Sequence, residues 1–112
     1  MYKYNDIGVI VINFLRPDVT KQCILSLIKY APDIQIYLGD QDKESLLEEW
    51  AKDYDTIHFY QLPYDCGISI ARNKLVQKIQ RNGLKYIMWI DNDFEFTENH
   101  NILDAKKILK EL

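Results

Sequence analysis

The chain of 112 residues is long enough for one domain, and its hydrophobic content of 47% is that of an ordinary globular protein. Its 14 basic and 17 acidic residues leave a formal charge of −3 without a basic stripe, which argues against nucleic-acid binding. The two isolated cysteines argue against a disulfide framework and favour a cytoplasmic location. No paired-histidine motif suggests a structural zinc site, and every apolar run is too short for a membrane span.

Apolar and amphipathic segments alternate along the chain. The apolar segments predict buried strands at 7–14, 34–38, 57–62 and 86–90. Helical spacing of apolar residues predicts helices at 17–30, at 45–52, from about 69 to 82, and from about 101 onwards. The resulting β-α-β-α-β-α-β-α pattern predicts an α/β fold with an open, mainly parallel sheet and helices on both faces. No linker divides the chain, so residues 1–112 are expected to form a single domain with strand order 3-2-1-4.

Polar residues follow each predicted strand. They are Asn13 and Arg16 after the first strand, Asp40 and Asp42 after the second, Asp65 and Gly67 after the third, and Asp91 and Asp93 after the fourth. With the strand order 3-2-1-4, the chain changes direction across the sheet between strands 1 and 4, which is where open α/β sheets bind ligands. We therefore expect Asn13 and Asp91 to flank one crevice.

The segment Asp91-Asn92-Asp93 carries two carboxylates at positions i and i+2 with no basic residue between them. Such a pair repels itself at neutral pH unless a cation is bound, and oxygen ligands suit Mg²⁺ and Mn²⁺. For the three residues alone, a solvated turn is the alternative interpretation.

Arg72 lies in the first turn of the third predicted helix, where a cation opposes the helix dipole. This position favours an acidic or phosphate partner for its guanidinium group. Gly67, just before that helix, permits backbone conformations closed to other residues. The other strand-end residues have structural alternatives: Asn13 could satisfy a turn, Asp40 and Asp42 could form a turn and a helix cap, and Arg16 could be a solvated charge.

Three segments resemble the family 2 glycosyltransferases of the GT-A fold. They are Asn13-Phe-Leu-Arg-Pro17, Asp65-Cys-Gly-Ile-Ser-Ile-Ala-Arg-Asn73 and Tyr86-Ile-Met-Trp-Ile-Asp-Asn-Asp93. The last two look most like the β-1,4-N-acetylgalactosaminyltransferase-like branch of that family. The resemblance extends from about Ile7 to Thr97, and the two blocks in this order and spacing are together fairly specific.

The resemblance implies a glycosyltransferase of the inverting type. It would bind a nucleotide-diphosphate sugar together with Mn²⁺ or Mg²⁺, and a UDP-sugar is the expected donor. By the same resemblance, Asn13, Arg16 and Asp40 would hold the nucleoside, and Asp65, Gly67 and Arg72 would line the base, ribose and diphosphate. Asp91 would meet the ribose or the metal, and Asp93 would ligate the metal. Because the segment after the second strand is Gly39-Asp40-Gln41-Asp42, either aspartate could be the nucleoside ligand.

The family's acceptor half and its general base are not recognisable in these 112 residues. We therefore expect the donor-binding half of an enzyme, truncated relative to a full glycosyltransferase, which binds donor weakly and transfers the sugar slowly or not at all. The acceptor would be a sugar, glycan or lipid-linked hydroxyl, and Asp42, Asp65 and Glu95 are the first candidates for a base.

Two alternative functions are a non-catalytic nucleotide-sugar-binding module and a protein-interaction module that forms homo-oligomers through an exposed sheet edge. A phosphatase is a weaker alternative, because its nucleophilic aspartate would normally follow the first strand, which here ends in Asn13.

Overall fold

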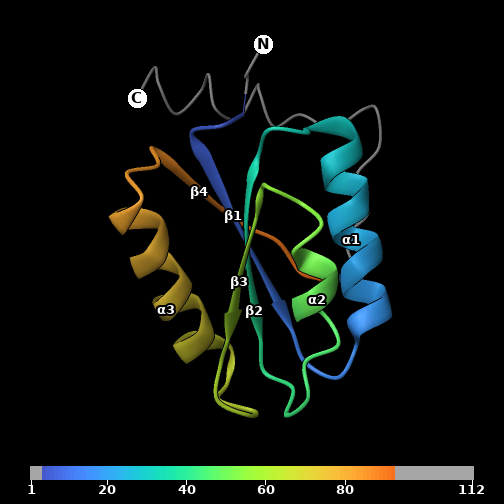
Figure 1. Ribbon diagram of the computed structural model, residues 1–112. Helices are drawn as coiled ribbons and strands as arrows, with labels where there is room; N and C mark the ends of the chain where they lie inside the picture. The colour runs from blue at the N-terminus through green and yellow to red at the C-terminus, as the bar shows by residue number, and fades with distance from the viewer. Residues whose placement is uncertain (1–3, 93–112) are drawn as a thin grey trace.

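Four parallel strands and three helices make up the part of the chain that the computed structural model describes, residues 4–92 (Figure 1). The elements are β1 (Ile7–Asn13), α1 (Pro17–Tyr30), β2 (Gln35–Asp40), α2 (Glu48–Ala51), β3 (Ile57–Gln61), α3 (Ile68–Arg81) and β4 (Tyr86–Trp89). The fold class predicted from the alternation of apolar and amphipathic segments is thus confirmed.

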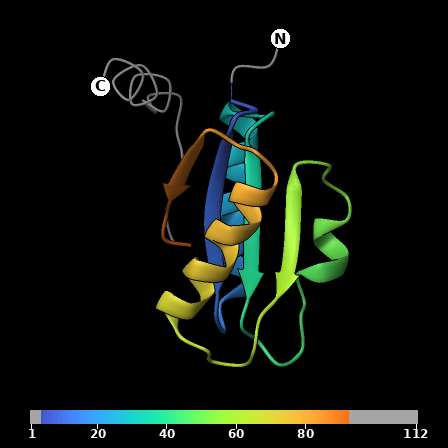
Figure 2. The same cartoon turned by 90° about the vertical axis from the view of Figure 1, so that its left-hand side faces the viewer.

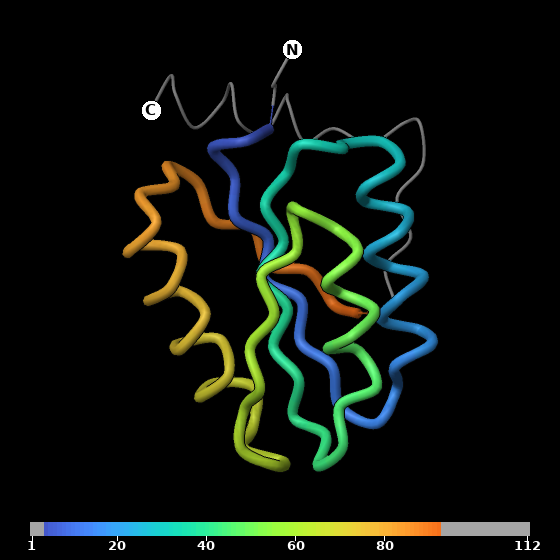
Figure 3. The backbone as a smooth tube through the Cα atoms, in the orientation of Figure 1, coloured from blue at the N-terminus to red at the C-terminus, as the bar shows by residue number. Residues whose placement is uncertain are grey.

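The strands are ordered β3-β2-β1-β4, as predicted, and all three neighbouring pairs are parallel. In the register, Ile10 of β1 lies between Tyr37 of β2 and Trp89 of β4. Because the strands are parallel, their carboxyl ends gather at one edge of the sheet, and the tube in Figure 3 follows them there. The order in which the chain adds strands reverses direction between β1 and β4, as the sequence predicted. In open α/β sheets such a point is where ligands bind.

The helices cover both faces of the sheet: α3 lies on one face, and α1 and α2 lie on the other (Figures 1 and 2). Successive side chains of β1 point to opposite faces. Val9 and Val11 belong to the core cluster on the α1 face, whereas Ile10 packs with Leu75 and Ile79 of α3. Burial on both faces explains why β1 is an almost continuous apolar run.

The second helix is shorter than the sequence predicted. Helical spacing gave residues 45–52, whereas α2 begins at Glu48, and Leu46 before it is 67% exposed. The Ser45 hydroxyl accepts hydrogen bonds from the backbone N–H groups of Leu47 and Glu48. These bonds hold residues 45–47 in a capping turn, so the helix starts only after it.

The fourth strand is half-buried on one face and exposed on the other, although its apolar run predicted a buried strand. Ile87 and Trp89 are 39% and 52% exposed, because α3 packs against β1 and β2 rather than over β4. Ile68, the first residue of α3, is also exposed. The predicted helix from about residue 101 lies outside the described residues, and within them no helix is long and apolar enough to span a membrane.

Candidate functional site

A buried hydrogen-bond network joins the carboxyl ends of β1 and β2. The side-chain amide of Asn13 donates to both Asp40 Oδ1, at 3.0 Å, and Asp42 Oδ2, at 2.9 Å. The remaining carboxylate oxygens accept from the Ser45 hydroxyl at 2.8 Å and from the backbone N–H of Leu15 at 2.6 Å. The structure therefore brings three predicted site residues together, but their side chains are buried and bond to one another.

The network continues to the end of β4 through a residue that the sequence analysis did not select. The Thr20 hydroxyl donates to Asn13 Oδ1 at 2.8 Å, and the Asn92 side-chain amide donates to Thr20 Oγ1 at 3.0 Å. Thr20 is a polar residue in the buried stripe of α1, together with Cys23 and Leu27. A hydroxyl in an otherwise apolar helix face is the sequence signal that could have identified it, because a buried polar group needs a partner.

A cleft of about 170 Å³ opens at the same edge, between the ends of β1 and β4 and the start of α3. Its apolar lining includes Phe14, Ile68 and Ile90. Its polar lining residues are Arg16, Gln41, Arg72, Asp91 and Asn92. Three of the predicted site residues, Arg16, Arg72 and Asp91, thus line one cleft, so its described lining includes two arginines and one acidic residue.

Arg72 is held at the wall of the cleft by stacking rather than by a tight ion pair. Its guanidinium carbon lies 4.8 Å from the centre of the Trp89 ring, a cation–π distance. Its Nη2 atom is 3.9 Å from Asp91 Oδ1, which is longer than a hydrogen bond, and the two side chains are 27% and 63% exposed. The stacked guanidinium therefore keeps donors available to an anion in the cleft.

The loop before α3 has a backbone conformation that requires glycine. Gly67 has φ 92° and ψ 153°, a combination essentially closed to residues with a Cβ atom. Its N–H donates to Gln41 Oε1 at 3.0 Å, which ties the loop to the end of β2. Gln41, between the two selected aspartates, was missed because nothing in its sequence context marks a tertiary partner. Asp65, also at positive φ, is exposed and does not line the cleft.

Within residues 4–92 there is no group of three or more histidine, cysteine, aspartate or glutamate side chains that could hold a metal ion. Asp91 has an exposed carboxylate at the cleft, which suits it as one ligand of a hard cation. Asp93 and Glu95 lie outside the described residues. Metal binding by Asp91 and Asp93 therefore stays a prediction.

Comparison with known proteins gives the family from sequence and the same fold from structure. The family model described as "Glycosyl transferase family 2" matches residues 8–107. Mouse beta-1,4 N-acetylgalactosaminyltransferase 2 is 35% identical over 89 residues, which are 80% of this chain and 16% of that protein. Human beta-1,4 N-acetylgalactosaminyltransferase 1 is 29% identical over 84 residues, which are 75% of this chain and 14% of that protein.

Among solved structures, S. aureus TarS (residues 1–349) shares the fold with a TM-score of 0.70 at 17% identity, over 94% of this chain and 32% of that one. The chain therefore spans about one-sixth of the length of these curated relatives and one-third of the solved chain. Because the family model covers most of the sequence, the chain belongs to glycosyl transferase family 2.

Proposed function

We propose that this chain is the donor-binding part of a glycosyltransferase and holds a nucleotide-diphosphate sugar in the cleft between β1 and β4. The observation that carries the proposal is the pair of guanidinium groups, Arg16 and Arg72, lining a cleft at the change of direction of the sheet. Guanidinium groups are well suited to phosphate oxygens, because their planar N–H donors match the geometry of the anion. Because the chain has a net charge of −3, an anionic ligand needs local positive charge, and these two arginines would supply it.

The start of α3 supports diphosphate binding in the same place. The first N–H groups of a helix have no partner within it, and the N-cap residue here is Gly67, which has no side chain to accept from them. Ile68, the first residue of α3, lines the cleft beside Arg72. We propose that Arg72 and these N–H groups bind the diphosphate, while Arg16 approaches it from the end of β1.

We further propose that Asp91 and Asp93 bind Mn²⁺ or Mg²⁺ beside the diphosphate. When bound, such an ion acts as a Lewis acid toward the departing nucleoside diphosphate. The loose contact between Arg72 and Asp91, 3.9 Å long, favours this arrangement, because the carboxylate is free to turn from the guanidinium to a cation.

The nucleoside contacts predicted for Asn13, Asp40 and Asp42 stay a prediction. Their hydrogen bonds to one another favour an indirect role, in which the network fixes the end of β1 that carries Phe14 and Arg16. We propose that the exposed ring of Tyr64, which packs edge-on against Phe14 at a centroid distance of 5.6 Å, offers a surface for the base.

Transfer of the sugar to an acceptor hydroxyl is the proposed activity of the whole protein. We propose N-acetylgalactosamine as the first sugar to test, because the relatives quoted above carry its name. Neither described base candidate is well situated: Asp42 is buried with both carboxylate oxygens hydrogen-bonded, and Asp65 does not line the cleft. The chain itself is therefore proposed to bind donor and to transfer slowly or not at all.

Calorimetric titration of UDP and of uridine, with Mn²⁺ and with EDTA, tests the proposal. UDP should release heat with Mn²⁺ and lose that heat in EDTA or in Asp93→Ala. Arg72→Ala should weaken UDP binding by about 10- to 100-fold, as expected for a lost charged hydrogen bond, and leave uridine binding unchanged. Arg81→Ala, at the opposite end of α3, is the matched control and should bind UDP like the unmodified chain. Equal UDP binding in EDTA would remove the metal from the proposal, and an equal loss of uridine binding would remove the role of Arg72.

A further inference from the structure

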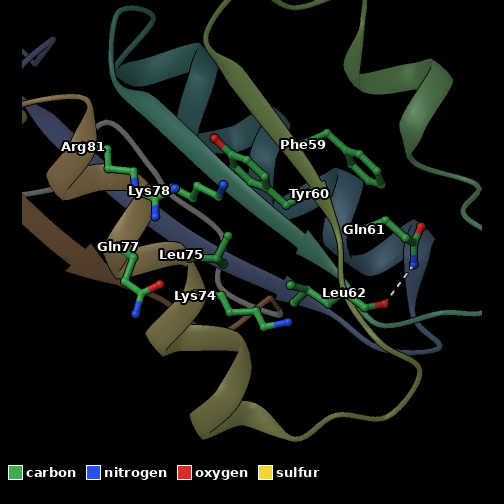
Figure 4. A pocket seen from close by; sticks show the side chains of 9 residues that line it. All are labelled: Phe59, Tyr60, Gln61, Leu62, Lys74, Leu75, Gln77, Lys78 and Arg81. Carbon is green, nitrogen blue, oxygen red and sulfur yellow. Dashed lines mark hydrogen bonds between the residues drawn. The ribbon is translucent and has the colours of Figure 1, made fainter.

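A second hollow, of about 500 Å³, lies between β3 and α3 (Figure 4). Lys74, Lys78 and Arg81 line it from the helix, and Tyr60 and Leu62 line it from the strand and its end. It shares no lining residue with the cleft between β1 and β4. We call it the β3–α3 groove.

The charge in the β3–α3 groove is of one sign. Its three cations are spaced i, i+4 and i+7, so they follow one side of α3 over about 10 Å. No described carboxylate lines the groove, and none of the three cations forms an ion pair within residues 4–92. The 14 residues of α3 (ISIARNKLVQKIQR) include basic side chains and no acidic one, in a chain whose net charge is −3.

The helix dipole accounts for only part of this arrangement. Lys78 and Arg81 lie in the last turn of α3, where cations are favourable. Lys74 lies a turn earlier, and the like charges of Lys74 and Lys78, four residues apart, repel each other. An anion in the groove would relieve that repulsion.

The floor of the groove is partly apolar, and one of the three cations packs against it. Lys78 Nζ lies 5.5 Å from the centre of the Tyr60 ring, which in turn stacks on Tyr37 at 6.2 Å. Leu62 and Leu75 are buried beneath it. Charges beside apolar surface are less screened by water, so they attract an anion more strongly than free surface lysines do.

From this geometry we propose that the β3–α3 groove binds a linear polyanion, whose phosphate or carboxylate groups are spread over about 10 Å to match the helix. An acidic oligosaccharide and a polyphosphate-type chain share this chemistry. This groove is separate from the cleft between β1 and β4, which we call the donor cleft, and the polyanion proposal does not depend on donor binding.

Calorimetric titration of two probes, tripolyphosphate and tetragalacturonate, distinguishes these sources, and maltotetraose serves as the neutral comparison. At least one anionic probe should bind, and Lys74→Gln/Lys78→Gln/Arg81→Gln should weaken it at least tenfold. The control Lys29→Gln/Lys52→Gln/Lys85→Gln changes the net charge equally outside the groove and should bind as before. Lys74→Glu should also weaken binding of the anionic probe. It is a single change at an exposed position, so it is less able to disturb the fold than the triple change.

Several results would overturn the proposal. Failure of both anionic probes to bind the unmodified chain would do so, as would equal weakening by the two triple variants, which would show attraction to overall charge only. UDP binding with Mn²⁺ should survive in the groove variant. Its loss there would show that the groove is the diphosphate site and not a separate one.

Discussion

Asn13 joins three segments of the site through one buried side chain. Its buried amide donates to two carboxylates, and its oxygen accepts from Thr20. Asp40 and Asp42 are both buried, so their carboxylates cannot replace a lost hydrogen-bond donor with water. The end of β1, with Arg16 just beyond it, is thereby held in register with the end of β2.

Asn13→Ala should therefore destabilise the fold strongly. Removing the shared donor leaves two buried carboxylates short of a hydrogen bond, which should lower the free energy of unfolding by about 2–4 kcal/mol. Chemical denaturation measures the change. Asn73→Ala, the same substitution at an exposed position of α3, should change it by less than about 0.5 kcal/mol. Similar effects of the two substitutions would contradict the buried network.

The sequence could predict where these residues lie but not what they bond to. Parallel strands bring their carboxyl ends to one edge, so Asn13, Asp40 and Asp42 could be placed together from the strand pattern alone. Whether a strand-end carboxylate points into a cleft or to a neighbouring amide depends on side-chain packing between segments distant in the chain. For the same reason Gln41, which is buried and bonds to Gly67, carried no signal in its local context.

At the scale of elements, β3 is an outer strand of the described sheet, and a half-buried histidine helps to pair it with β2. His58 Nε2 lies 2.8 Å from Gln35 Oε1, and the ring stacks on Tyr37 at a centroid distance of 4.5 Å. Burial disfavours the charged imidazolium and so lowers the pKa of His58 below its ordinary 6.5.

This shift predicts how the stability of the sheet depends on pH. Below about pH 6.5 the unfolded chain protonates His58 before the folded chain does, so the free energy of unfolding should fall as the pH falls toward the folded-state pKa. The slope from this one group is at most about 1.4 kcal/mol per pH unit. Denaturation between pH 5.5 and 7.5 should show a smaller slope in His58→Gln, because every other titratable group is the same in the two proteins. Identical slopes would show that His58 is not desolvated in the folded state.

The elements that the sequence predicted least well are those whose limits or exposure depend on side-chain hydrogen bonds or on packing between elements. The strands and the helices α1 and α3 follow from periodicity, because each buries a stripe or a whole run of side chains. The start of α2 depends on the Ser45 hydroxyl, and the exposure of β4 depends on which strands α3 covers. Neither is encoded in the hydrophobic pattern of the segment itself.

For the molecule as a whole, α3 contributes residues to both of the proposed binding surfaces. Arg72, the fifth residue of α3, lines the cleft between β1 and β4, and Lys74, Lys78 and Arg81 farther along the helix line the β3–α3 groove. A helix with basic side chains and no acidic ones can thus offer anion sites at two places on an acidic chain.

Mapping of amide chemical shifts by NMR, while a UDP-sugar and Mg²⁺ are added to the isotope-labelled chain, tests the donor cleft most directly. We expect the largest shifts at the backbone amides of Gln41, Arg72 and Asn92 and at the indole of Trp89, because these groups line or support the cleft. Amides along β3 and the last turns of α3 should stay unshifted. Shifts confined to the β3–α3 groove, or none at a saturating concentration of the UDP-sugar, would contradict donor binding between β1 and β4.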